Sequence, residues 1–193
     1  MPAKLIVFEG MNRAGKTTQA KKLFEFLKEQ NFRVLYTKEP QATAIGAVAK
    51  SMIRDEKFSS EAIAIAFAAD TRHHIDSVLK PALDSCDFII LDRYYHSSYA
   101  YHPLMGCGMA WIKELHRHVL KPDITFILDI TITVFRERAP DKDDIFENVA
   151  FQERLRAAYL ELPKLLSEDF VILDGTKSID EVHSEIRKKV MFL

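Results

Sequence analysis

The chain has 193 residues, of which 48% are hydrophobic and 28% are charged, and its 27 Lys and Arg residues balance 28 Asp and Glu residues. This is the composition of an ordinary globular protein, and the length suits one sizeable domain over residues 1–193. The even charge balance gives no support to nucleic-acid or membrane-surface binding, which needs a basic excess or a basic face.

Apolar runs alternate with helical patterns along the chain. The continuous apolar runs predict strands, and apolar residues spaced three and four positions apart predict helices. The expected strands are 5–8, 33–37, 87–91, 124–130 and 170–173. The expected helices are 16–30, 44–54, 61–84 (one or two helices, with Ser60 as N-cap), 111–119, 133–138, 150–166 and 178–190. This alternation predicts an α/β fold with a central parallel sheet flanked by helices on both faces, and with its loops gathered at the carboxyl ends of the strands.

The cysteines and the N-terminus bear on the cellular compartment. Cys86 and Cys107 form no C-x-x-C pair, so we expect free thiols in a reducing compartment. The short apolar run in "MPAKLIVFEG" leads into a glycine, which is typical of a strand and not of a signal peptide. No apolar run reaches the roughly 18 residues that a membrane span requires. We therefore expect a cytoplasmic protein.

The segment 10–17, "GMNRAGKT", matches G-x-x-x-x-G-K-[ST] at every fixed position, between a predicted strand and a predicted helix. Its glycines allow backbone N–H groups to curl around phosphate oxygens, and the helix N-terminus adds partial positive charge. Lys16 supplies a point charge for the β- and γ-phosphates, and the Thr17 hydroxyl can ligate Mg²⁺. The motif predicts a nucleoside triphosphate site but does not say what happens to the nucleotide.

A second polar pair, Asp92-Arg93, comes directly after the predicted strand "DFIIL". A carboxylate there can lie near Mg²⁺ or its water shell, and an arginine can clamp a second anionic group by two parallel hydrogen bonds. Two phosphate-binding features on adjacent strands indicate transfer between two nucleotides. On the dipeptide alone, a surface salt bridge between Asp92 and Arg93 is the alternative.

Six segments in order, "FEGMNRAGKTTQ", "TKEPQATAIG", "FAAD", "LDRYYHSSYAY", "LKPD" and "FENVAFQERLRAAY", resemble the thymidylate kinase family. The resemblance runs from Leu5 to the end of the chain. It implies a P-loop nucleoside monophosphate kinase fold, transfer of the γ-phosphoryl group of ATP to dTMP with Mg²⁺, and a homodimer. It also implies a short lid near residues 136–149.

The resemblance assigns roles to individual residues. It implies catalytic roles for Arg13, Lys16 and Arg93, and Mg²⁺ contacts for Thr17 and Asp92. The residues expected to bind ATP are Gly10, Asn12, Arg13, Ala14, Gly15, Lys16, Thr17, Thr18, Arg138 and Gly175. The residues expected to bind dTMP are Asn12, Lys38, Phe67, Thr71, Arg72, Arg93, Ser97, Ser98, Tyr101 and Glu147.

Among these, the resemblance implies that thymine stacks on Phe67 and that Tyr101 packs under the deoxyribose. From the residues alone, Phe67 is interpreted as a residue of the hydrophobic core and Tyr101 as a half-buried packing residue. Lys38 replaces an arginine that is common in the family.

Two departures from the family pattern bear on the acceptor. Asn12 stands where the family has an acid that accepts from the sugar 3′-hydroxyl, so we expect weaker recognition of that group. Thr71 stands where the family has an arginine that reads the thymine edge, and Arg72 follows one residue later. Since one residue turns a helix by about 100°, either Arg72 bends back to the base or Thr71 and water read it.

Arg13 is the expected arginine finger in cis, because one branch of the family places an arginine at this point of the loop. The alternatives are an exposed loop charge at Arg13, with Arg136 or Arg138 reaching the phosphates instead.

Three functions stay open at this point. The leading one is an ATP-dependent dTMP kinase. A second is a kinase for another pyrimidine monophosphate such as dUMP, or for a nucleoside. A third is a regulatory P-loop protein with little catalysis. The Asp92-Arg93 pair stands where a switch GTPase would carry Asp-x-x-Gly, and the sequence has no Asn-Lys-x-Asp guanine motif, which counts against the third.

Overall fold

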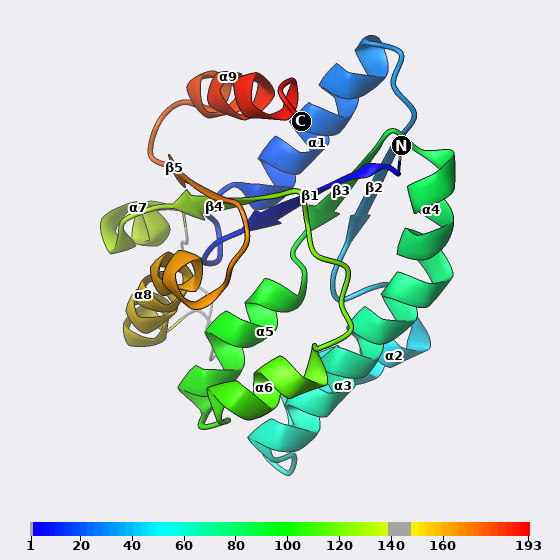
Figure 1. The fold of residues 1–193 in the computed structure, drawn as a ribbon. Coiled ribbons are helices and arrows are strands. Elements are labelled where there is room, and N and C mark those ends of the chain that lie inside the picture. The colour runs from blue at the N-terminus through cyan, green and yellow to red at the C-terminus, as the bar shows by residue number, and fades with distance from the viewer. Residues whose placement is uncertain (1, 139–147) are drawn as a thin grey trace.

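The computed structural model describes residues 2–138 and 148–193. The strands within these residues form one all-parallel sheet with the order β2-β3-β1-β4-β5 (Figure 1). They are β1 (Lys4–Glu9), β2 (Val34–Lys38), β3 (Phe88–Asp92), β4 (Ile124–Asp129) and β5 (Phe170–Asp174). The predicted parallel α/β sheet is confirmed, and the predicted strand bounds agree with the observed ones to within one residue at each end.

The continuous apolar strands lie at the centre of the sheet. Every residue of β3 is buried, and β1 is buried from Leu5 to Glu9, because helices cover both faces. The register pairs Phe8 of β1 with Asp92 of β3. The phosphate loop, which follows β1, and Arg93, which follows β3, therefore emerge side by side at one edge of the sheet.

Helices cover both faces of the sheet. Figure 1 shows α1 (Lys16–Glu29) and α9 (Ile179–Val190) packed together on one face, with α3 (Ser60–His74), α5 (Tyr95–Tyr101) and α8 (Val149–Leu165) on the other. The remaining helical elements are α2 (Ala44–Met52), a π-helical turn η1 (Ile75–Leu79), α4 (Lys80–Ser85), a 3₁₀ turn η2 (His102–Met105), α6 (Met109–Leu115) and α7 (Ile132–Glu137).

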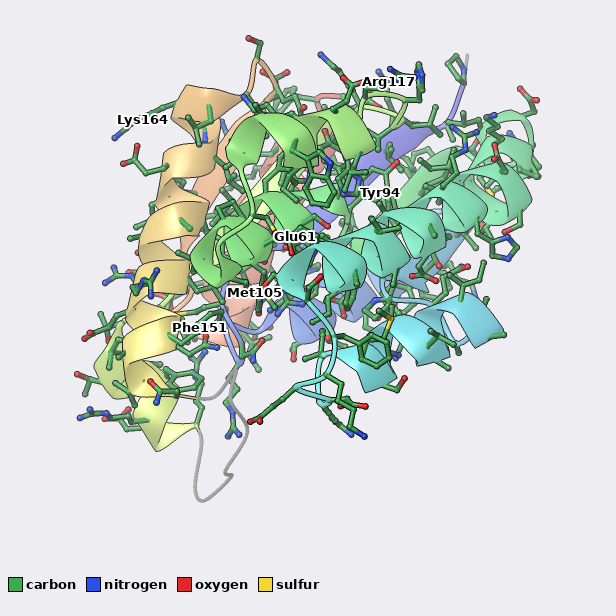
Figure 2. All side chains as sticks on the ribbon, turned by 90° about the horizontal axis from the view of Figure 1, so that it is seen from below. Glu61, Tyr94, Met105, Arg117, Phe151 and Lys164 are labelled. Atoms are coloured by element: carbon green, nitrogen blue, oxygen red, sulfur yellow. The ribbon has the colours of Figure 1, made fainter. Side chains whose placement is uncertain are left out.

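Some helix boundaries differ from the prediction. Ser59, and not Ser60, is the N-cap of α3, because its hydroxyl accepts from the Ala62 N–H at 3.2 Å. The Ser60 hydroxyl instead donates to the Met105 carbonyl at 2.7 Å, which ties the start of α3 to η2 (Figure 2). The predicted 61–84 helix is one run of α3, η1 and α4, and α6 ends earlier than expected.

Helix α5 has no counterpart in the predicted elements. In its sequence, YHSSYAY, alanine is the only strong helix former, and no side chain caps its N-terminus. The helix is instead stabilised by burial, since Tyr95, Tyr99 and Ala100 all join the core. None of the helices in the described part of the chain is both long and apolar enough to span a membrane, and Cys86 and Cys107 form no disulfide.

Candidate active site

The phosphate loop between β1 and α1 depends on two glycines. Gly10 has φ 134°, and a Cβ there would lie 2.4 Å from the Leu128 carbonyl oxygen. Gly15 has φ 98° at the N-cap of α1. Both conformations are open to glycine at little steric cost. The loop therefore presents the first N–H groups of α1 to the space in front of it, which is the geometry of an anion site.

Lys16 is buried beside this loop, and its Nζ donates to the Met11 carbonyl at 2.8 Å. Burial lowers the pKa of Lys16 to about 7, and the Arg93 charge adds to this, although Asp92 and Glu9 oppose it. A polyphosphate placed here would favour the ammonium form, since an opposite charge at close range stabilises it. Lys16 is thus positioned as a phosphate ligand.

Thr17 and Asp92 meet across the gap between α1 and β3. The Thr17 hydroxyl donates to the Asp92 carboxylate, and the Tyr36 hydroxyl lies 3.5 Å from the same Asp92 oxygen. One carboxylate with one hydroxyl fits Mg²⁺, which binds through few protein oxygens and completes its octahedron with water and phosphate oxygens. The described residues contain no cluster of three or more His, Cys, Asp or Glu side chains that could hold a metal ion by themselves.

Arg93 follows Asp92 with a left-handed backbone at φ 70°. Its Nη1 donates to the Tyr159 hydroxyl at 2.8 Å, and its Nη2 donates to the Asn12 amide oxygen at 2.8 Å. The Tyr101 hydroxyl donates to the same Asn12 oxygen at 3.1 Å. The guanidinium is mostly buried, with 18% of the side chain exposed.

Three adjoining cavities cross this edge of the sheet. One of about 410 Å³ has Phe67 and Tyr101 in its wall and is called here the acceptor cavity. A second of about 320 Å³ lies over the phosphate loop, and a third of about 260 Å³, the donor cavity, lies beside α9. Asn12 and Arg93 line both of the first two, and Arg13 lines both of the last two. The three cavities therefore adjoin through shared residues, and Lys16 lines the one over the phosphate loop.

The acceptor cavity has an aromatic wall and a polar end. The Phe67 ring lies 5.8 Å from the His102 ring, and Arg93 and Asn12 lie at the end nearest the phosphate loop. A flat aromatic base can stack on a ring such as Phe67 while an attached phosphate reaches an arginine. The lining residues of the acceptor cavity are Asn12, Glu39, Pro40, Lys50, Ile53, Arg54, Phe67, Thr71, Arg93, Tyr94, Ser97, Ser98, Tyr101, His102 and Met105.

Two arginines border the donor cavity. Arg13, at φ 62°, donates from Nη1 to the Arg138 carbonyl at 2.6 Å. Arg138 donates back to the Arg13 carbonyl at 3.1 Å and to the Gly175 carbonyl at 3.0 Å. Ala14, Gly15 and Thr18 line the same cavity. Of the residues predicted to bind ATP, six line this cavity, and Asn12, Lys16 and Thr17 line the cavity over the phosphate loop.

The sequence matches the family model described as thymidylate kinase over residues 8–186. A probable thymidylate kinase of Thermococcus kodakarensis is 35% identical, with 94% of each chain covered. A thymidylate kinase of Sulfurihydrogenibium sp. is 34% identical over 94% of this chain and 93% of the relative. One of Fervidobacterium nodosum is 34% identical over 95% and 96%. This chain belongs to the thymidylate kinase family. The predicted family and the predicted class of enzyme, a nucleoside monophosphate kinase, are confirmed.

The structure separates the two residues that were expected to read the base in this member of the thymidylate kinase family. Thr71 lines the acceptor cavity, and its hydroxyl donates to Glu39 Oε2 at 2.7 Å. Arg72 lies on the outer side of α3, where Nε donates to Asp76 Oδ2 at 2.7 Å and Nη1 to the His118 carbonyl at 3.4 Å. The 100° turn between neighbouring residues directs Arg72 away from the cavity in this structure, and its contact with the acceptor stays a prediction.

Five other residues that were predicted to bind the acceptor lie in different places. Ser97 lines the acceptor cavity, but its hydroxyl donates to Oε2 of the buried Glu9 at 2.8 Å and so points to the inside of the protein. Lys38 lines the cavity over the phosphate loop and not the acceptor cavity. Glu147 lies outside the described residues. Ser98 and Tyr101 line the acceptor cavity, and their contacts with dTMP stay predictions.

Sequence reasoning missed Glu9 and Tyr159. Glu9 ends β1 fully buried, and its carboxylate accepts from the Tyr94 N–H at 2.8 Å and from the Tyr159 hydroxyl at 2.9 Å. A charged residue that ends an apolar strand directly before a phosphate loop is a signal that could have identified Glu9. Tyr159 occupies a core position of α8 with no local signal.

Proposed function

We propose that this chain transfers the γ-phosphoryl group of ATP to dTMP, giving dTDP and ADP. The observation that carries the proposal is that Lys16, Thr17 and Arg93 line one cavity over the phosphate loop. The names of the relatives, all thymidylate kinases, supply the identity of the acceptor. The family supplies ATP as the donor.

The donor nucleotide is proposed to lie over the phosphate loop with its base in the donor cavity. Backbone N–H groups from Gly10 to Thr18 would surround the phosphates, and Lys16 would contact the β- and γ-phosphates. Arg138 and Gly175 border the base end of the cavity. We retain the segment 136–149 as the proposed lid over ATP within a single domain.

The acceptor is proposed to place its base on Phe67, its sugar against Tyr101, and its phosphate on Arg93. Asn12 and Ser98 lie along this line, and Lys38 faces the phosphates from the second cavity. Glu147 stays a predicted contact. The aromatic stack contributes about 0.5–1.5 kcal/mol beyond burial, and the charged hydrogen bonds to phosphate contribute about 1.5–3 kcal/mol each.

Thr17 and Asp92 are the residues that would hold Mg²⁺. The ion, when bound, neutralises charge on the β- and γ-phosphates. The carboxylate of Asp92 and the hydroxyl of Thr17 already lie in contact, so the protein oxygens that orient the ion's shell need no large rearrangement.

The chemical step needs alignment and charge stabilisation. An oxygen of the acceptor phosphate forms a bond to the γ-phosphorus, and the bond from that phosphorus to the oxygen bridging it to the β-phosphate breaks. Arg93 holds the attacking group, and Lys16 stabilises charge on the transferring and leaving groups. Arg13 is proposed as the arginine finger, since it lines both the donor cavity and the cavity over the loop.

A coupled ADP-release assay across dTMP, dUMP, UMP, CMP and thymidine tests this function. We expect the highest kcat/KM with dTMP. Turnover that prefers any other acceptor would overturn the dTMP assignment while leaving the kinase class intact.

A second candidate, phosphorylation of another pyrimidine monophosphate such as dUMP, is favoured by one observation. The hydroxyl of Thr71 donates its hydrogen bond to Glu39, and Arg72 is paired with Asp76 outside the cavity. The edge of a bound base would therefore face Thr71 and Glu39 in place of the arginine of the family pattern. The same acceptor panel decides between the two candidates.

We also propose that the protein is a cytoplasmic homodimer. Support comes from the exposed apolar side chains Ile45 and Val48 on α2 and Ile65 on α3, which a second subunit could cover. Light scattering after size exclusion would report the mass, and a monomer at micromolar concentration would remove the dimer.

A further inference from the structure

Arg93 is held by a buried group of oxygen atoms that lies behind the acceptor cavity. We propose that Glu9 and Tyr159, acting with Ser97, are positioning residues that fix the Arg93 guanidinium for the acceptor phosphate. This inference rests on the proposed function, in which Arg93 clamps that phosphate.

The two Nη groups of Arg93 have different partners. Nη1 donates to the Tyr159 hydroxyl at 2.8 Å, the Ser97 hydroxyl at 3.2 Å and the Gly10 carbonyl at 3.3 Å. Nη2 donates to Asn12 Oδ1 at 2.8 Å and to the Tyr101 hydroxyl at 3.4 Å. Of these partners, Tyr159 and Gly10 lie outside the acceptor cavity wall, whereas Ser97, Asn12 and Tyr101 are part of it. Both named partners of Nη2 line the cavity and two of the three named partners of Nη1 do not, so Nη1 is the anchored end and Nη2 is the end nearer to an incoming phosphate.

Glu9 sets the direction of the hydrogen bonds at the anchored end. Its Oε2 accepts from the Ser97 hydroxyl at 2.8 Å and from the Tyr159 hydroxyl at 2.9 Å. A hydroxyl has one proton to donate, so both hydroxyls turn their lone pairs toward Arg93. The buried carboxylate thereby converts two ambivalent groups into two fixed acceptors for one guanidinium.

The charge of Glu9 acts in the same direction. Glu9 Oε2 lies 3.8 Å from Arg93 Nη1, and the Glu9 side chain is fully buried. Its other oxygen, Oε1, accepts from the Tyr94 N–H at 2.8 Å and the Ser97 N–H at 3.2 Å. A carboxylate with four donors and a neighbouring guanidinium is compensated despite its burial. The pair holds Nη1 in place, while Nη2 lies among Asn12 and Tyr101 in the acceptor cavity wall.

Tyr159 remains a neutral phenol in this setting. Burial and the nearby Glu9 carboxylate raise the pKa of Tyr159 well above its ordinary value, although Arg93 lowers it in part. The phenol therefore keeps the proton that it donates to Glu9 over any ordinary assay pH. The positioning contact is predicted to be insensitive to pH in the neutral range.

The test compares binding of dTMP and thymidine, because only dTMP carries the group that Arg93 would clamp. Calorimetry would measure both dissociation constants for the wild type, Tyr159→Phe and Glu9→Gln. For Tyr159→Phe we expect dTMP binding to weaken roughly tenfold, as fits loss of a hydrogen bond to a charged group, with thymidine binding changed less than about twofold. In turnover, KM for dTMP rises while KM for ATP stays constant.

Tyr99→Phe is the matched control, since Tyr99 is a buried tyrosine that packs on Tyr95 and His116 and not on the site. It is expected to leave both ligands' affinities unchanged. If Glu9→Gln fails to fold, Tyr159→Phe decides alone. Equal losses for dTMP and thymidine, or no loss for dTMP, would overturn the positioning role. A wild type that binds thymidine as tightly as dTMP would instead overturn Arg93 as the phosphate clamp, and the positioning role with it.

Discussion

The Asn12 amide oxygen accepts a 2.8 Å hydrogen bond from Arg93 Nη2, which joins the phosphate loop to the residue that follows β3. The loop position at which the family pattern has an acid therefore still provides an acceptor oxygen, but without a negative charge. Both residues line the acceptor cavity and the cavity over the phosphate loop.

Asn12→Asp tests what the missing charge does. A charged hydrogen bond is worth about 1 kcal/mol more than a neutral one, so discrimination between dTMP and its 3′-deoxy analogue should rise about fivefold. The measurement is the ratio of kcat/KM for the two acceptors. Asn31→Asp, in the turn after α1, is the control. An unchanged ratio would mean that Asn12 does not contact the 3′-hydroxyl.

Arg13→Ala tests the arginine finger. An arginine that stabilises the transition state contributes on the order of 10³-fold or more to kcat, so single-turnover transfer should slow by about that factor with little change in dTMP affinity. Arg136→Ala, at the last turn of α7, is the comparison. A normal kcat for Arg13→Ala together with a slow Arg136 or Arg138 variant would move the finger to the lid.

Asp92→Asn tests the magnesium assignment. Removing the carboxylate that meets Thr17 should raise the Mg²⁺ concentration for half-maximal rate about tenfold, because an amide is a weaker ligand for a hard cation. Asp87→Asn, just before the other end of β3 and paired with exposed Arg33, is the control and should titrate as the wild type does. Identical Mg²⁺ curves for all three proteins would remove Asp92 from the metal site.

Acid should destabilise the fold through two buried histidines. Burial lowers the pKa of His102 and of His116 from 6.5 to about 4, and His102 and His96 contribute to the shift at His116. Between pH 6.5 and pH 4 the two histidines bind protons more readily in the unfolded chain than in the folded one. The free energy of unfolding therefore falls as the pH decreases from 6.5 toward 4. Each ring accounts for roughly 3 kcal/mol across the window.

Urea unfolding at pH 7 and pH 4.5 measures this loss. His116→Phe should lose less stability between the two pH values than the wild type, whereas exposed His73→Phe should lose as much. Equal losses in all three proteins would show that His116 does not titrate with unfolding.

The sequence predicted the parts of the site that are local. The sequence places Lys16 and Thr17 in the motif after β1, and Asp92 and Arg93 at the end of β3. Parallel pairing of β1 with β3 brings both pairs to one edge of the sheet. The strands themselves were predictable because their continuous apolar runs match burial on both faces.

Other features depend on contacts between distant segments. Tyr159 reaches Arg93 from a helix 66 residues further along the chain, and no local pattern marks it. The orientation of Arg72 was open because a shift of one helical position changes its partner from the cavity to Asp76. Helix α5 forms because aromatic burial outweighs weak helix propensity, which a sequence pattern underestimates.

Transfer of labelled phosphate tests the central claim most directly. The protein is incubated with γ-³²P-labelled ATP, Mg²⁺ and dTMP, and the products are separated. We predict that the label moves into dTDP, that it does so only when dTMP is present, and that Lys16→Ala reduces the transfer by at least about 10²-fold. Label released as inorganic phosphate, or ATP and dTMP bound without any labelled dTDP, would contradict the claim.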